Sequence, residues 1–481
     1  MNFEIIPWLS YTAQFIHMAA VVVTMIYMLY KYRREPIAIY FIFLCWPFAF
    51  IFLGKNIHDM YKVLMLLYTM YMFINTKSIK SYSPKEIWLP LLFVLFTAQF
   101  FWAVYMYSAN SLTIIFSQYS RYFETILLFF IIKRTVVYFG KRDMLLHLFY
   151  DIGLMQIIIS IVKWFAFGQQ VESYVGSFAV IGGEMGTTIP ILWFMILWLY
   201  RKGNFSKWDW AYIMGLLWLG FTTGKRAVMF ILPVVVFVFM VYVQGIRLQK
   251  YMFIALAFVP ILFYFGVRLT PTLNPEHKVW GSFDWDYAWG YAEEYQFGKE
   301  GVEGQVTTFQ EERTRLEITG GNINTSSKQL KADGRGGATI AILKLLFGLH
   351  PTQDSDWWGT GFANMYSTDY ATFDKLQLTI RINHKGSATG FFQSYVTTGI
   401  LGALATVLLC FSYLFYYKKK RLMWVVIGVC AWEYFMYTGS IFRMPAFMAV
   451  LFLLMHYTNL NENVSARYRY VNNHQLQNQS H

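Results

Sequence analysis

Apolar stretches of about twenty residues, the length of a bilayer-spanning helix, recur along the whole chain. Short polar stretches separate them. The pattern predicts thirteen membrane-spanning helices, or twelve if the crowded 209–244 region holds one fewer. The predicted ranges are 8–30, 36–54, 60–76, 87–108, 112–132, 144–166, 178–200, 209–223, 226–244, 250–268, 390–417, 422–439 and 441–458.

The amino-acid composition agrees with this pattern. Hydrophobic residues make up 57% and charged residues 14% of the chain, whereas soluble domains carry about 25% charged residues. These values exclude an ordinary soluble enzyme, a disordered chain and a disulfide scaffold, so the fold class that we expect is an all-α polytopic integral membrane protein. Cys45, Cys410 and Cys430 lie inside apolar stretches and are interpreted as buried hydrophobic residues.

Basic residues occur at every second connection between the predicted helices, for example at Lys31, Lys133, Arg201 and Lys418. Cytoplasmic loops of membrane proteins carry such an excess of Lys and Arg. The alternation places the N-terminus outside and the C-terminus in the cytoplasm. It also explains the net charge of +13 without a nucleic-acid partner. Residues 1–7 lack a positive segment, so we expect no cleavable signal peptide.

This orientation divides the chain into four regions. We expect an N-terminal transmembrane bundle at 1–269, an extracytoplasmic loop domain at 270–389, a three-helix transmembrane segment at 390–458 and a disordered cytoplasmic tail at 459–481. Residues 271–386 contain fifteen acidic and eleven basic side chains, so the outer loop is net negative while the rest of the chain is strongly basic.

Charged residues in or beside hydrocarbon are costly, which makes them candidates for function. Those on the predicted outer side are Arg121, Glu124, Lys163, Glu184, Lys225, Arg226 and Arg443. Arg121 and Glu124 are three residues apart on one helix face and can neutralise each other. Lys163 can extend its ammonium to the membrane interface. We expect Glu433 and His456 to be satisfied within the helix bundle.

Two clusters near the outer surface suit an anionic substrate. Lys225 and Arg226 follow Thr222-Thr-Gly at a tight corner before a helix, where free N–H groups and the helix dipole favour an anion. A lipid headgroup is an equally weighted alternative ligand. Arg381, His384 and Lys385 precede the apolar stretch at 390. Histidine can act as a general base near neutral pH, although a lone interfacial histidine is more often structural.

The aromatic stretch 280–297 includes Trp285 and Trp289, with acidic residues between the rings. Flat aromatic faces would suit sugar rings, but they would equally suit the interfacial belt of membrane proteins, which we favour. The sequence contains no GxxxxGK[ST], HExxH or CxxC motif. We therefore expect neither a metal nor a cofactor.

Three motifs, in this order, carry a family resemblance. The first is Thr-Gly-Lys-Arg-Ala at 223–227, where a helix begins. The second is Arg335, an apolar helix, His350-Pro351 and Gly359-Thr-Gly361. The third is His384 followed by Phe-Phe-Gln and Gly-Ile-Leu-Gly within 391–402. Together with one large late outer loop and three helices after it, this order resembles the O-antigen ligase and Wzy-type polysaccharide polymerase superfamily of bacterial envelope enzymes. His384 stands about four residues further upstream than in the family pattern, and Lys385 replaces its asparagine.

The resemblance implies a metal-independent, inverting glycosyltransferase at the outer face of the bacterial cytoplasmic membrane. Its donor would be an undecaprenyl-pyrophosphate-linked oligosaccharide. Arg226 and Arg335, with Lys225, would bind the diphosphate, and His384 would be the catalytic base. Further candidates for substrate binding are Arg381, Arg121, Arg443, Trp285 and Trp289.

Three functions remain open at this point. A surface-polysaccharide polymerase (O-antigen, capsule or exopolysaccharide) would join lipid-linked repeat units, and it is the leading hypothesis. An O-antigen ligase would transfer the finished glycan to a lipid A core. A transporter or flippase would move the same lipid-linked sugars, and a non-enzymatic scaffold is the weakest option. The expected partners are the glycan donor, the acceptor and membrane lipids, with a chain-length regulator as a further candidate and no nucleic acid.

Overall fold

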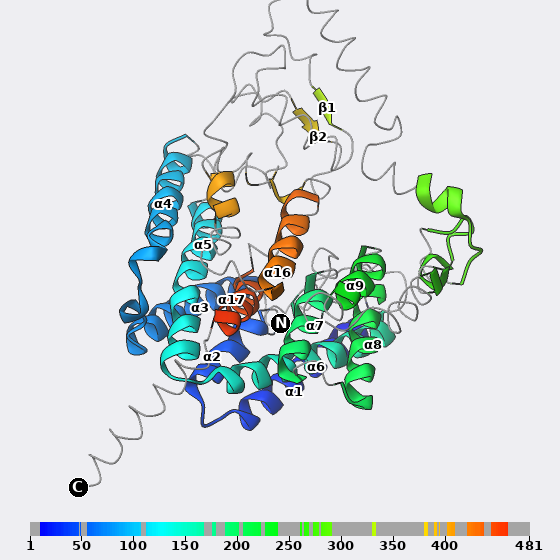
Figure 1. The fold of residues 1–481 in the computed structure, drawn as a ribbon, viewed down its shortest axis with the longest axis horizontal. Coiled ribbons are helices and arrows are strands. Elements are labelled where there is room, and N and C mark those ends of the chain that lie inside the picture. The colour runs from blue at the N-terminus through cyan, green and yellow to red at the C-terminus, as the bar shows by residue number, and fades with distance from the viewer. Residues whose placement is uncertain are drawn as a thin grey trace, which may run out of the picture.

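Helices dominate the part of the chain that the computed structural model describes (Figure 1). The described residues are 10–47, 49, 55–106, 112–167, 176–178, 188–201, 205–222, 227–238, 260–261, 264–268, 273–278, 280–290, 330–332, 380–382, 389–391, 394, 402–408, 421–436 and 444–459. The mostly helical structure agrees with the expected fold class. One pair of short strands stands apart from the helices within these ranges.

The α-helices lie where the apolar pattern predicts them. They are α1 (Tyr11–Lys31), α2 (Pro36–Cys45), α3 (Lys55–Asn75), α4 (Trp88–Met106), α5 (Leu112–Lys133), α6 (Arg142–Phe167), α7 (Thr188–Arg201), α8 (Lys207–Thr222), α9 (Ala227–Val238), α16 (Arg421–Ala431) and α17 (Pro445–Asn459). Short 3-10 helices, η2 (Ser78–Ser81) and η3 (Pro84–Glu86), join α3 to α4, and π-helical turns, η4 (Arg134–Tyr138) and η9 (Trp432–Met436), extend α5 and α16. Helical residues at 260–261, 264–268, 390–391, 394 and 402–408 fall in the two remaining predicted ranges.

Two predicted helices differ from the structure. The range 36–54 was expected to be helical throughout, but α2 ends at Cys45, and Pro47 and Ala49 lie in turns. A proline disfavours helical backbone at the residue before it.

The range 178–200 was also expected to be helical throughout, but residues 176–178 form a turn and a bend, and α7 is described from Thr188. Gly176 has a left-handed backbone (φ +57°), and its N–H donates to the Ser160 hydroxyl at 2.9 Å. Side chains of α6 thus satisfy the backbone here, so these residues form a turn instead of a helix.

Local signals explain several helix boundaries. Ser10 accepts a backbone N–H from the first turn of α1 at 3.2 Å, and Pro36 opens α2 at a position where a missing N–H costs nothing. Lys77, with a left-handed backbone (φ 52°), follows α3. Ser83 and Glu86 form a capping box at η3.

Two helices meet the length and hydropathy of a membrane crossing among the described residues, Tyr11–Lys31 and Arg142–Ala166. Five shorter stretches of 10–17 residues are also apolar helices. A mostly helical chain is therefore confirmed for the described residues, whereas the number of helices and the crossing of a membrane by all thirteen of them stay predictions.

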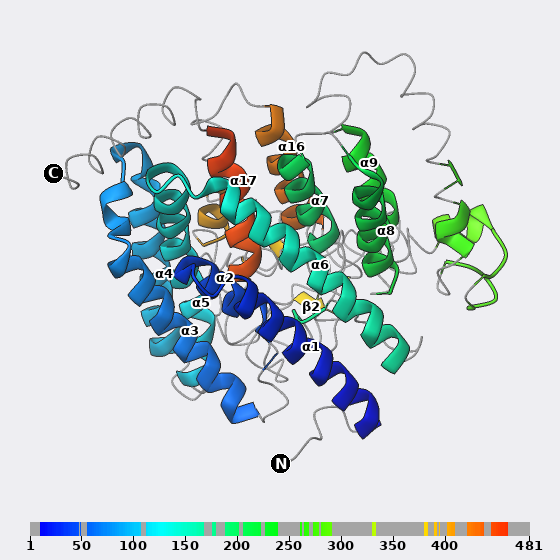
Figure 2. The same ribbon diagram turned by 90° about the horizontal axis from the view of Figure 1, so that it is seen from below.

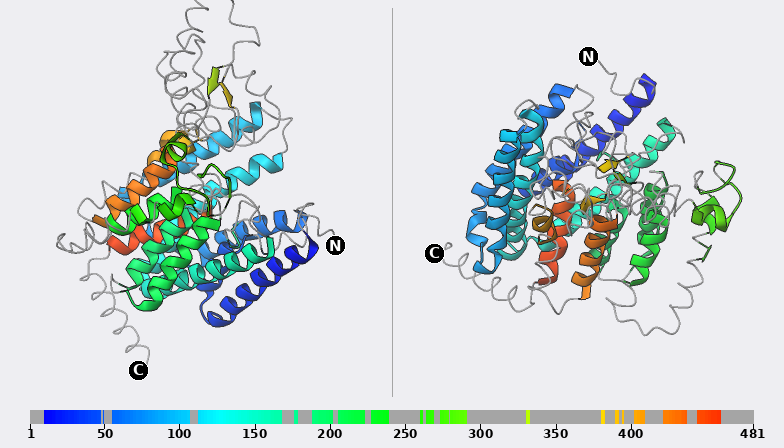
Figure 3. Two further views of the ribbon diagram at one scale, coloured as in Figure 1. Left: turned by 90° about the vertical axis from the view of Figure 1, so that its right-hand side faces the viewer. Right: turned by 90° about the horizontal axis from the view of Figure 1, so that it is seen from above.

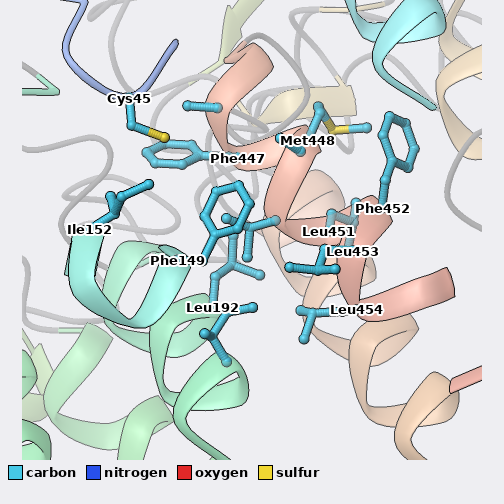
Figure 4. Close-up of a cluster of buried hydrophobic side chains, with 14 of the residues drawn as sticks. Cys45, Phe149, Ile152, Leu192, Phe447, Met448, Leu451, Phe452, Leu453 and Leu454 are labelled. Atoms are coloured by element: carbon cyan, nitrogen blue, oxygen red, sulfur yellow. The ribbon is translucent and has the colours of Figure 1, made fainter. Parts of the chain in front are cut away.

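The core forms where α17 packs between α5, α6 and α7. Figure 4 shows Phe149 and Ile152 of α6, Leu192 of α7 and Phe447 and Phe452 of α17 in one apolar cluster. From Phe447 to Met455 every side chain of α17 is at most 1% exposed. A helix that is apolar on all sides is expected to be buried on all sides, as α17 is. Helix α1 packs along α6 (Figure 2).

Ion pairs join several chain segments at one end of the helix bundle, which we call the basic end. Their nitrogen–oxygen pairs are Lys31–Asp151 (2.7 Å), Lys133–Glu86 (2.6 Å), Lys141–Glu35 (2.5 Å) and Arg201–Asp209 (2.8 Å). Tyr200 at the end of α7 also contacts the ring of His147 near the start of α6. The predicted cytoplasmic connections up to residue 209 thus lie together, as alternating helix directions require. The axes of most helices in the bundle lie roughly parallel, while the chain direction alternates (Figure 3).

Candidate functional site

Most residues of the predicted reaction centre fall outside the described part of the chain. These residues are His384, Arg226, Lys225, Arg335 and Arg443. Glu184 and most of the predicted outer loop are outside it too. The described residues closest in sequence to Arg335 and His384 are those of the two strands, and segment 264–290 precedes them in the chain.

The strands β1 (Leu330–Ala332) and β2 (Ile380–Ile382) pair in parallel (Figure 1). Arg381 stands directly opposite Lys331 in the register. Neither strand has a sequence signal, because three residues are too few for an alternating pattern. The pairing brings together two chain segments that are 50 residues apart in the sequence.

Because β1 and β2 are parallel, their C-terminal ends lie at the same edge of the sheet. Two parallel strands deliver the chain to the same edge of the sheet, about 4.8 Å apart. Arg335 follows the end of β1 by three residues, and His384 follows the end of β2 by two. The two strands that precede these residues in the chain therefore end at one edge of the sheet.

Arg121 lies on α5, partly buried, and within electrostatic range of Glu124. Glu124 is buried and accepts a hydrogen bond from the Thr69 hydroxyl of α3 at 2.8 Å. The hydroxyl of Tyr40 on α2 lies 2.8 Å from the same Thr69 oxygen. A chain of donors from Tyr40 through Thr69 to Glu124 satisfies the carboxylate inside the bundle. These contacts favour the structural interpretation of Arg121 and Glu124.

Lys163 does not extend its ammonium to an interface, so that interpretation was wrong. Its side chain is fully buried, and Nζ donates to the carbonyl oxygen of Gly176 at 3.1 Å. Two further side chains of α6, Ser160 and Gln156, bind backbone N–H groups of the same turn, at Gly176 and Ser177. The turn folds back onto α6, and its Gly176 carbonyl accepts the hydrogen bond from Lys163. Lys163 thus anchors the chain segment that leads towards α7.

Glu433 and His456 lie within the bundle, as expected. Glu433 is fully buried on the π-helical turn η9. His456 is 1% exposed, and its ring contacts the Phe129 ring at a centroid distance of 4.9 Å. Their burial between helices agrees with a structural role.

A polar cluster around Asp151 has no counterpart in the sequence analysis. The buried Asp151 carboxylate of α6 accepts from Lys31 at 2.7 Å and from the Tyr32 hydroxyl at 2.6 Å. His147 Nδ1 lies 2.7 Å from the Tyr32 hydroxyl and 3.4 Å from Asp151. Burial, and then the hydrogen bond to Asp151, raise the pKa of Tyr32 well above its usual value. The signal that could have found the cluster is the i, i+4 pair of His147 and Asp151 inside an apolar stretch.

Trp285 and Trp289 lie on a short helix at residues 285–290. Their rings stack at a centroid distance of 6.1 Å and an angle of 15°. The rings are 52% and 62% exposed. The sequence placed both residues in one aromatic stretch, and the structure adds that their faces are nearly parallel.

Within the described part of the chain, no three His, Cys, Asp or Glu side chains form a group that could hold a metal ion.

Comparison of the chain with protein-family models, with curated proteins and with solved structures finds no match.

Proposed function

We propose that this chain is a polytopic membrane glycosyltransferase that polymerises undecaprenyl-pyrophosphate-linked repeat units into a surface polysaccharide. The proposal combines the order of the three sequence motifs with the parallel pairing of β1 and β2. That pairing is the observation that carries it, because the strands that end shortly before Arg335 and His384 in the sequence end at the same edge. A backbone rise of about 3.3–3.6 Å per residue keeps each of them within about 11 Å of its strand end.

Exposed apolar side chains support the membrane location. On α1, Val23, Ile26, Tyr27 and Tyr30 are each about half exposed or more, and their spacing of three or four residues forms one stripe. Helices α3 and α4 expose further apolar residues such as Leu67. Monomeric soluble proteins rarely expose contiguous apolar patches larger than a few hundred Å². Lipid chains are the environment that such stripes suit.

The proposed reaction joins an acceptor sugar to the anomeric carbon of the donor. His384 takes the proton of the acceptor hydroxyl, and the acceptor oxygen forms a bond to the anomeric carbon as the bond to the diphosphate oxygen breaks. Attack from the opposite side inverts the anomeric configuration. Arg226 and Arg335, with Lys225, neutralise the charge that develops on the leaving diphosphate, and a guanidinium can do so with two parallel hydrogen bonds.

Purified protein in lipid nanodiscs provides the first test. Supplied with undecaprenyl-pyrophosphate-linked oligosaccharide and with neither nucleotide nor added metal, it should release undecaprenyl pyrophosphate and lengthen the glycan. His384→Ala, Arg226→Ala and Arg335→Ala should each abolish release while membrane insertion and abundance stay normal. Arg226→Lys should also be impaired, because an ammonium cannot replace the bidentate contact.

Other outcomes would point elsewhere. Uptake of the lipid-linked sugar into sealed vesicles without release of the carrier would indicate a transporter. Full activity of His384→Ala would remove the histidine from the base role and direct attention to Lys385, Asp369 and Asp374. In a deletion strain, single repeats left on the carrier or on the core indicate a polymerase. Long chains stranded on the carrier indicate a ligase.

A further inference from the structure

Trp285 and Trp289 lie near the end of segment 264–290, in the predicted outer loop, and their rings stack on each other. They stand one helical turn apart, stack within 15° of parallel and are each more than half exposed. Residues four apart lie on the same face of a helix, so both rings extend from one side. We call this pair the tryptophan platform.

Another side of the short helix packs against earlier residues of the same segment. Ala288 is buried against Val267 and Leu273 in a small apolar cluster of its own. The Asp284 carboxylate caps the helix by accepting the N–H of Tyr287 at 3.0 Å. The helix therefore presents its tryptophan face outwards in a fixed orientation.

Residues before the helix hold the same segment rigid. Arg268 stacks over the Trp280 ring at 4.7 Å and donates to the Gly281 carbonyl at 2.8 Å, while the Gly281 N–H returns to the Arg268 carbonyl at 2.9 Å. The Asn274 side chain donates to the Lys278 carbonyl at 2.8 Å, and a Cβ at Gly281 would approach it to 2.2 Å. Because this segment is already ordered by close packing, a ligand that binds to it loses less free energy to the ordering of the protein.

The charges around the tryptophan platform do not suit the headgroup of an anionic lipid as its ligand. Asp284 and Asp286 flank Trp285, and Glu276 caps the backbone N–H of Ser282 at 2.7 Å. That hydrogen bond from Ser282 lowers the pKa of Glu276, so its carboxylate is ionised near neutral pH. Anionic lipid surfaces attract clusters of Lys and Arg, and this segment has no basic excess.

We propose that the tryptophan platform binds the glycan chain, away from the diphosphate end, by stacking the outer face of each indole against a sugar ring. A pyranose has an apolar C–H face, which suits an indole face, and a rim of hydroxyl groups. Asp286 follows Trp285 and is exposed, and a carboxylate accepts hydrogen bonds from such hydroxyls. The platform deepens the proposed function, on which the identity of the glycan rests.

Saturation-transfer NMR tests the platform on the full-length chain in nanodiscs. The probe is a water-soluble oligosaccharide of two or more repeat units, released by mild acid from the lipid carrier of the same bacterium. Sugar C–H protons should receive saturation from the protein. Trp285→Ala and Trp289→Ala should each weaken binding about tenfold, which corresponds to about 1.4 kcal/mol. Trp285→Phe, which keeps a flat ring, should lose less.

Trp208→Ala is the matched control, because Trp208 is 81% exposed but begins α8 at the basic end. It should bind the oligosaccharide as the unchanged chain does. The platform is wrong if Trp285→Ala and Trp289→Ala also bind normally. It is equally wrong if nanodisc lipids with brominated acyl chains quench these two tryptophans, since the rings would then lie in the membrane interface.

Repeating the saturation-transfer measurement on the His384→Ala variant separates oligosaccharide binding from catalysis. Retained binding in this variant supports the platform, because stacking does not need the base. If the unchanged chain binds the oligosaccharide but never releases undecaprenyl pyrophosphate, the platform stands and the proposed function fails. Release that continues while the oligosaccharide shows no binding overturns the platform alone.

Discussion

At the scale of single residues, buried polar groups are satisfied by partners from distant helices. Asp151 of α6 binds Lys31 and Tyr32 at the end of α1, and Glu124 of α5 binds Thr69 of α3. A buried carboxylate without donors is costly, so each contact selects one arrangement of the helices. Both clusters lie among described residues that the proposed reaction does not use.

Asp151→Ala should lower stability, because it removes the acceptor of the Tyr32 hydroxyl and the partner of Lys31. The expected loss is about 1–3 kcal/mol, since Lys31 is partly exposed and can regain water. Thermal unfolding of the purified protein measures it. Asp143→Ala on the same helix is the control: its carboxylate pairs with Arg142 at the surface, where such pairs contribute about 0–1 kcal/mol. Equal unfolding temperatures for both variants would contradict the role of Asp151.

At the scale of elements, close approach between helices depends on small residues. Gly153 of α6 faces α7 and α8, and a Cβ built there would lie 2.0 Å from both Trp193 Cδ1 and Tyr212 Oη. The indole N–H of Trp193 donates to the Phe149 carbonyl of α6 at 2.9 Å, which holds the two helices together. Tyr212 also stacks on Tyr150. Three helices thus meet at one glycine.

Gly153→Ala is expected to push α7 and α8 away from α6. Overpacking of this kind costs about 1–3 kcal/mol, and backbone must move to relieve a contact at 2.0 Å. Thermal unfolding and size-exclusion chromatography would record the loss. Gly428→Ala on α16 has open space at the same position and should be neutral or stabilise the helix by up to about 1 kcal/mol. A Gly153→Ala variant as stable as Gly428→Ala would show that the contact relaxes freely.

At the scale of the whole molecule, the ion pairs of the basic end hold together the chain segments that are predicted to face the cytoplasm. The C-terminal turn of α17 lies at the same end, because His456 contacts Phe129 near the end of α5. Segment 264–290 belongs to the predicted outer side. The predicted topology places a membrane between the basic end and this segment.

Cysteine labelling in intact spheroplasts should distinguish the two surfaces. In a chain whose native cysteines are replaced by alanine, Asp286→Cys should react with a membrane-impermeant maleimide from outside. Lys80→Cys should react only after the membrane is opened, because its connection is predicted to be cytoplasmic. Both side chains are exposed, so access is decided by sidedness and not by burial. Labelling of Lys80→Cys from outside would reverse the proposed orientation.

The sequence by itself determined the positions of the helices, since backbone hydrogen bonds within a helix join residues four apart and about twenty apolar residues in succession specify each one. It also predicted that Glu433 and His456 would lie inside the bundle. Motif order identified His384, Arg226 and Arg335 as candidates, and these stay predictions because they lie outside the described residues.

Only the tertiary structure decided which polar groups meet. Lys163 became buried because a turn after α6 folds back onto it, and no local pattern indicates that turn. Strands β1 and β2 pair across 50 residues of sequence with three residues each, so their register depends on the rest of the fold. Ala288 of the short helix packs against Val267 and Leu273, which precede it in the sequence by more than ten residues. Each of these contacts joins residues brought together by packing, and spacing along the chain does not encode it.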